Sequence, residues 1–261
     1  MGDTPETLDV QHLHIQHLPS QRFLVRDLSL RLERGRTLGL AGESGSGKSL
    51  TALAIMGLLP PECAIVDGEV RMAGDLIMSA EVNRGPEIRG DRVGMVFQEP
   101  SAALNPVVTV QRHLVDAIRC KSMASRAQAR EMARDLLESL RITDPDRCLK
   151  SYPHELSGGM KQRVVLAAAM IHKPTFLIAD EPTTALDVTV QAQILMLLKE
   201  LSSQSSTAIL FISHDLRVLA HMAEHIAIMH RGRVLEYGST LAVLQHSEEP
   251  YTRRLIASLP T

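Results

Sequence analysis

Residues 42–49 read GESGSGKS and fit the pattern G-x-x-x-x-G-K-[ST]. The apolar segment RTLGLA precedes this stretch and the helix-forming segment SLTALAIMGL follows it, so the glycines lie between a predicted strand and a predicted helix. Glycine lets backbone amides turn inward around phosphate oxygens, and a helix N-terminus adds positive potential. We therefore expect a phosphate-binding loop made of these residues: Gly42, Glu43, Ser44, Gly45, Ser46, Gly47, Lys48, Ser49 and Leu50.

Within this loop, Lys48 is expected to reach the β- and γ-phosphates of a nucleoside triphosphate, and Ser49 to hold Mg²⁺. Hydrolysis also needs a metal carboxylate and a group that orients water. FLIADE at residues 176–181 is an apolar strand ending in two carboxylates, so we expect Asp180 to bind the metal and Glu181 to act as the base.

A second apolar strand, AILFIS, ends directly before His214. Parallel strands present their carboxyl ends at one edge of a sheet, which is where open α/β sheets bind ligands. A histidine in that position is expected to sense the γ-phosphate.

Composition limits the class of protein. The 261 residues carry 28 Lys and Arg against 30 Asp and Glu, so no general attraction to nucleic acid or to an anionic membrane is expected. The N-terminus MGDTPETLDV is polar, and no apolar run approaches the roughly 18 residues of a membrane helix. We expect a soluble, cytoplasmic chain that reaches a membrane through partners.

The hydropathy pattern indicates an α/β fold. From about residue 8 to residue 40, the segments LDVQHLHI, FLVRDLSLRL and RTLGLA predict antiparallel strands, whereas residues 100–153 predict helices. Later, FLIAD and AILFIS alternate with helical segments, which is typical of a parallel sheet. The hairpin pattern IAIMHRGRVLEYG follows them.

LSGGMKQR at residues 156–163 resembles the signature motif of ABC ATPases. Further elements of that family match in order along the chain. Gln98 in MVFQEP resembles the Q-loop, residues 185–187 in TTALD resemble the D-loop, and His214 resembles the switch histidine.

This resemblance implies an ABC-type P-loop NTPase fold, with a mostly parallel core sheet, an N-terminal antiparallel β subdomain and a helical subdomain carrying the signature. We expect one ABC ATPase domain over residues 1–261, with the nucleotide-binding core and β subdomain in 1–99 and 173–261 and the helical subdomain in 100–172.

The family resemblance also assigns site residues. Ser157, Gly158 and Gly159 open a helix and would meet the ATP held by a second subunit. Gln98 would join Glu181 in catalysis and also ligate Mg²⁺. ATP and Mg²⁺ are thus the implied cofactors.

Longer strings are similar to one subfamily, the ATPases of oligopeptide, dipeptide and nickel importers: FQEPSAALNP, YPHELSGGMKQR, IADEPTTALDVTVQAQIL and EPYTRRLIASLP. The chain ends without the cysteine-bearing tail of many peptide members, so nickel or a nickel chelate is the preferred solute and short peptides the second. The implied partners are a second ABC ATPase subunit (a paralogue or another copy), two membrane permeases and an extracytoplasmic solute-binding protein, at the cytoplasmic face of the inner membrane.

Alternatives remain open from other classes. ATPases of DNA repair and chromosome structure share these motifs but insert long coiled coils, whereas residues 50–155 show no sustained heptads. A non-catalytic partner subunit would be expected to lose Glu181, His214 or the signature. The residue that stacks on adenine is undecided. The aromatic residue available before Leu24 is Phe23, which also fits the pattern of an ordinary strand residue.

Overall fold

A computed structural model describes residues 6–184 and 186–258 of the chain. These residues form two compact units. The first unit joins Met1–Arg89 to Ser206–Thr261, and the second unit is Gly90–Ser205.

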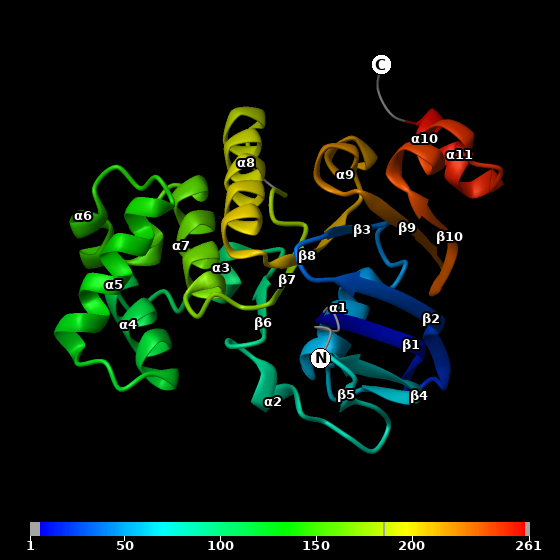
Figure 1. The fold of residues 1–261 in the computed structure, drawn as a ribbon, viewed down its shortest axis with the longest axis horizontal. Coiled ribbons are helices and arrows are strands. Elements are labelled where there is room, and N and C mark those ends of the chain that lie inside the picture. Colours follow the sequence, from blue (N-terminus) through cyan, green and yellow to red (C-terminus); the bar gives the residue numbers. More distant parts are fainter. Residues whose placement is uncertain (1–5, 185, 259–261) are drawn as a thin grey trace, which may run out of the picture. The chain divides into compact units, whose positions relative to one another are not determined.

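An antiparallel sheet occupies much of the first unit (Figure 1). Its strands, in the order β2-β1-β4-β5, are β1 (Thr7–His17), β2 (Arg22–Glu33), β4 (Cys63–Met72) and β5 (Asp75–Met78). Buried and exposed residues alternate along the second half of β2, because one face packs on a core that includes Leu13, Ile15 and Leu28. The antiparallel prediction is confirmed for the first two predicted segments, and β4 and β5 are additional strands.

The antiparallel prediction is wrong for the third segment, RTLGLA. β3 (Thr37–Ala41) pairs in parallel with both β8 (Ala208–Ser213) and β9 (His225–His230). Every residue of β3 is buried, as expected for a central strand with both faces covered. Such strands are typical of parallel sheets, whereas strands of an antiparallel sheet often have one exposed face, as β2 does. β10 (Arg233–Ser239) pairs antiparallel with β9, which confirms the predicted hairpin.

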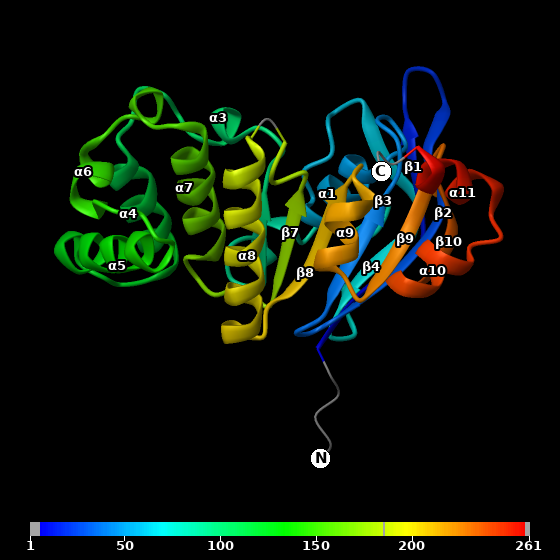
Figure 2. The ribbon, with the colours of Figure 1, turned by 90° about the horizontal axis from the view of Figure 1, so that it is seen from above.

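The helices of the first unit are short. They are α1 (Lys48–Met56), α2 (Gly85–Ile88), α9 (Leu216–Met222), α10 (Thr240–His246) and α11 (Pro250–Ala257). α10 and α11, drawn in red, lie beside the β9–β10 hairpin in Figures 1 and 2. The C-terminal segment is thus part of the packed first unit.

The second unit confirms the helical prediction for residues 100–153. Among its described residues, the strands β6 (Val93–Val96) and β7 (Phe176–Asp180) pair in parallel. Its helices are α3 (Pro100–Ala103), α4 (Val110–Lys121), α5 (Arg126–Ser139), α6 (Pro145–Lys150), α7 (Gly158–Met170) and α8 (Val188–Ser205), with a 3-10 turn at Pro153–Glu155. Ser125 and Gln128 form a capping box that starts α5.

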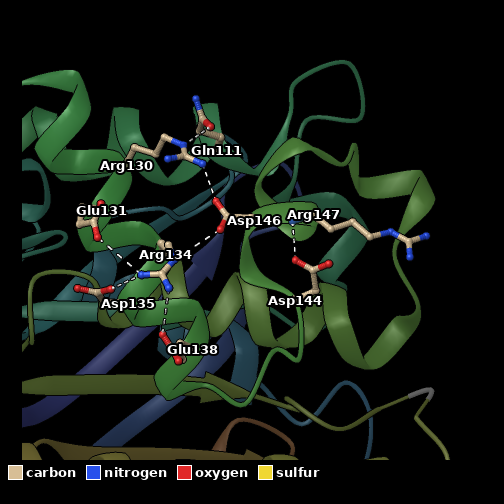
Figure 3. Close-up of polar contacts among 9 residues, drawn as sticks. All are labelled: Gln111, Arg130, Glu131, Arg134, Asp135, Glu138, Asp144, Asp146 and Arg147. Carbon is tan, nitrogen blue, oxygen red and sulfur yellow. Dashed lines mark hydrogen bonds and ion pairs between the residues drawn. The ribbon is translucent and has the colours of Figure 1, made fainter.

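Polar side chains join three of these helices (Figure 3). The Asp146 carboxylate, at the start of α6, accepts a 2.5 Å bond from Arg130 of α5 and lies 3.6 Å from the Arg134 guanidinium. Arg130 also donates to the Gln111 side chain of α4 at 3.2 Å. These groups are partly exposed, so each pair contributes less than about 1 kcal/mol, but together they orient α4, α5 and α6.

Across the described ranges, no helix combines the length and the apolar character that crossing a bilayer requires.

Candidate functional site

The glycine-rich loop leads from β3 into α1 and folds around Lys48. This lysine is 5% exposed, and its Nζ donates to the backbone carbonyls of Gly42 at 2.8 Å and Glu43 at 2.9 Å. Ser46 Oγ lies 3.4 Å from the same nitrogen. An ammonium group is therefore held at the centre of a loop whose residues 43–45 are exposed.

The start of α1 fits an anion. Gly47 is the N-cap, in the left-handed conformation, and supplies no side chain to cap the first turn. The first-turn amides of an uncapped helix can donate to phosphate oxygens, which the positive end of the helix also favours. Ser49 is exposed in that first turn, where its hydroxyl can serve as an oxygen ligand.

The loop also lies directly against the β9–β10 hairpin. A Cβ on Gly42, whose φ is +152°, would stand 2.1 Å from the carbonyl oxygen of Met229. The Gly232 amide donates to the Ser46 carbonyl at 2.9 Å. Glycine is therefore required at position 42 by close packing as well as by backbone conformation.

His214 lies at the same edge of the sheet as the loop. β3 and β8 are parallel with Ala41 opposite Ser213, so Gly42 and His214 leave neighbouring strands side by side. Asp215 caps α9 by accepting from the Arg217 amide at 2.9 Å. The Arg217 guanidinium, hydrogen-bonded to Asp215, lowers the pKa of that carboxyl.

In the second unit, β7 ends in the two predicted carboxylates. Asp180 is buried, and the next residue, Glu181, has a φ of +45°. Residues other than glycine rarely adopt this conformation, and those that do cluster at functional sites. Glu181 Oε2 accepts from Gln98 Nε2 at 3.3 Å and from Thr184 Oγ1 at 2.9 Å. The structure thus brings together Gln98 and Glu181, and it adds Thr184, which belongs to no motif that predicts a site residue from the sequence.

The signature residues open α7. Ser157 is its N-cap, and the Ser157 hydroxyl accepts from the Met160 amide at 3.3 Å. Ser157 and Gly158 are exposed. A Cβ on Gly159 would lie 2.7 Å from the Val190 side chain, so the small residue lets α7 approach α8 closely.

Arg163 supports this helix from inside the second unit. It is 9% exposed and donates to the Leu140 carbonyl at 2.6 Å and to Gln193 Oε1 at 2.9 Å, which ties α7 to the end of α5 and to α8. Burial, and secondly Arg141, lower the pKa of the Arg163 guanidinium. A cavity of about 560 Å³ beside it also reaches Ser157.

The oxygen donors predicted for a metal are a hydroxyl, an amide and a carboxylate, on Ser49, Gln98 and Asp180. Such hard oxygen ligands suit Mg²⁺ when phosphate and water complete its shell. Of the predicted D-loop, Ala185 lies outside the described residues, while the Asp187 carboxylate accepts from the Val190 amide at 3.0 Å.

Phe23, the aromatic left as a candidate for adenine stacking, belongs to β2. Its exposed ring meets the His14 ring edge-on, with 5.8 Å between centroids. The next residue, Leu24, places its carbonyl oxygen 3.1 Å from a Cβ built on Gly47. Phe23 therefore lies near the phosphate loop.

Comparison with known proteins identifies the family. Residues 25–184 match the ABC transporter family. The chain is 44% identical over 257 residues to the probable peptide ABC transporter ATP-binding protein y4tR of Sinorhizobium fredii, covering 97% of this chain and 76% of that protein. It is also 44% identical over 260 residues to the probable D,D-dipeptide transport ATP-binding protein DdpD of Escherichia coli, covering 98% and 79%.

A third relative, the glutathione import ATP-binding protein GsiA of Escherichia coli, is 42% identical over 266 residues, which cover 99% of this chain and 43% of GsiA. Among solved structures, the dimeric ATP-binding cassette MJ0796 in a post-hydrolysis state with ADP and Pi superposes with a TM-score of 0.78. It is 25% identical, and the match covers 89% of this chain and 98% of that one. The chain therefore belongs to the ABC transporter family, as an ATP-binding and ATP-hydrolysing member with that family's fold.

Proposed function

We propose that this chain uses ATP hydrolysis to energise the import of short peptides by a membrane transporter. The observation that carries the ATPase part is the loop around the buried Lys48, with the uncapped start of α1 beside it. Residues 42–50 hold the phosphates in this proposal, and Lys48 turns from the Gly42 and Glu43 carbonyls toward the β- and γ-phosphates.

Ser49, Gln98 and Asp180 would hold Mg²⁺, which neutralises phosphate charge when it is bound. Glu181 acts as the general base and takes a proton from the attacking water. Its hydrogen bonds from Gln98 and Thr184 orient the carboxylate for that step. His214 senses the γ-phosphate from the edge of β8.

A complete site would need two subunits. Ser157, Gly158 and Gly159 supply donors at the start of α7 for the nucleotide bound by a partner, and the similar solved cassette is dimeric. The partner is a paralogue or another copy of this chain. In this proposal residues 1–261 act as one ATPase domain, and the loop at residues 98–106 contacts the permease.

The dimer requirement predicts that ATP turnover per molecule falls on dilution. Because each site borrows a signature loop, monomers should hydrolyse slowly while still binding ATP. ATPase rates would be measured across a dilution series, with light scattering on the same samples. Full activity in samples that scatter as monomers would contradict the shared site.

If the transporter is an importer, the remaining partners are two permeases and an extracytoplasmic solute-binding protein. This chain would then lie at the cytoplasmic face of the membrane. We place short peptides first as the solute, because the relatives described above carry the names of peptide, D,D-dipeptide and glutathione transport proteins. Nickel or its chelate, the solute of the importer ATPase NikD, stays second, because the longer strings quoted above are similar to a subfamily that includes nickel importers.

The solute can be tested in a strain lacking this gene, complemented with the wild type or with a Lys48→Ala copy. We expect the wild-type copy alone to restore uptake of a labelled dipeptide, with nickel accumulation equal in all strains. Nickel uptake that depends on the wild-type copy, with normal dipeptide uptake, would reverse the order. In either case the ATPase assignment is unaffected, because the proposal places no residue of this chain on the solute.

A further inference from the structure

The C-terminal helix of the first unit reaches the phosphate loop. α11 begins after Glu249, whose carboxylate accepts from the Tyr251 amide at 3.2 Å. Tyr251 is 4% exposed, and Thr252 beside it is fully buried. The start of α11 is therefore an anchored segment of the first unit.

Two contacts connect the Tyr251 side chain to the loop. The Glu43 amide donates to Tyr251 Oη at 3.3 Å, across 208 positions of sequence. The Tyr251 ring lies against the His230 ring, with 4.0 Å between centroids. His230 directly follows Met229, whose carbonyl closely approaches Gly42.

The backbone of Glu43 is thus held on both sides of its Cα atom. Tyr251 accepts from its N–H, and Lys48 Nζ donates to its carbonyl. When Lys48 turns toward a phosphate, its bond to this carbonyl is lost, whereas the bond from the Glu43 N–H to Tyr251 does not depend on Lys48. Burial raises the pKa of the Tyr251 hydroxyl, so its oxygen stays neutral near pH 7.

We propose that Tyr251 is a positioning residue for nucleotide binding: through the Glu43 amide it keeps the phosphate loop in its binding conformation. The inference rests on ATP binding at residues 42–50 and assigns Tyr251 no contact with the nucleotide. In this proposal α11 belongs to the nucleotide site because Tyr251 holds the backbone of the phosphate loop in place.

The test is Tyr251→Phe, which removes the hydroxyl and keeps the ring against His230. Tyr237→Phe is the matched control: Tyr237 stacks on His225 with centroids 6.0 Å apart, but it is 52% exposed. His225 pairs with Leu38, at the opposite end of β3 from the loop. Both variants keep an aromatic ring against a histidine, but Tyr251→Phe removes a hydrogen bond to the phosphate loop and Tyr237→Phe does not.

We expect Tyr251→Phe to weaken ADP binding about fivefold, which is about 1 kcal/mol, the contribution of one ordinary hydrogen bond. Glu43 is exposed, so water can replace part of the lost bond. The KM for ATP should rise by the same factor, with kcat changed less than about twofold, because uniform binding is lost and not transition-state contacts. Tyr237→Phe should match the wild type.

Binding would be followed by calorimetry with ADP, and folding by the melting temperature of each nucleotide-free protein. Unchanged ADP affinity in a folded Tyr251→Phe protein would overturn the inference. So would an equal loss in Tyr237→Phe, or a fall in kcat at constant KM. Failure of the wild type itself to bind ADP would instead contradict the proposed function.

Discussion

Glu181→Gln should slow ATP hydrolysis by about 10²- to 10⁴-fold, the range for loss of a general base, while ATP binding stays close to that of the wild type. The amide has nearly the shape of the carboxylate but cannot take a proton from water. It also keeps an oxygen that can accept from Thr184, which now donates to Glu181 at 2.9 Å. The variant should therefore fold normally and hold its nucleotide.

The measurement is single-turnover hydrolysis together with ATP affinity. Glu200→Gln is a suitable control, because Glu200 is a carboxylate of the same unit that accepts two bonds from Arg141, at 2.6 and 2.8 Å, in an exposed pair. We expect wild-type turnover from this control. Equal turnover in Glu181→Gln and the wild type would remove Glu181 from the role of base.

Lys48→Ala should weaken nucleotide binding by about a hundredfold, since charge-assisted hydrogen bonds to phosphate contribute about 1.5–3 kcal/mol and 1.4 kcal/mol is a factor of ten. The substitution also removes the ammonium that holds the Gly42 and Glu43 carbonyls, so the loop loses an internal support. The lost phosphate contact and the lost support of the loop both weaken nucleotide binding.

Lys121→Ala provides the control for lost charge, because Lys121 pairs with Asp91 at 3.1 Å in the second unit. ADP affinity and the melting temperature of each nucleotide-free protein separate loss of binding from loss of fold. A folded Lys48→Ala protein with wild-type ADP affinity would contradict the assignment of the phosphate loop.

Local sequence patterns were sufficient for much of the fold. Helix α5 follows from the 3.6-residue periodicity of its apolar residues. The loop before Lys48 follows from glycine spacing between a strand and a helix. These features depend on neighbours within a few positions, which is why a single sequence reveals them.

Strand pairing was less accessible. RTLGLA closely follows the two antiparallel strands along the chain, and its sequence alone therefore predicts that it pairs with them. In the structure β3 pairs with β8 and β9, whose residues come more than 160 positions later. Pairing depends on which partners can cover both faces of a buried strand, and a short apolar run carries no record of that choice.

The sequence by itself determined which chemical groups are proposed for the site, namely Lys48, Asp180, Glu181 and His214, within motifs that also point to the family. Only the tertiary structure decided what supports them, including the Thr184 and Gln98 bonds to Glu181 and the Tyr251 bond to the Glu43 amide. Of these contacts, those of Gln98 and Tyr251 join residues 83 and 208 positions apart, so they exist only after separate elements have packed together.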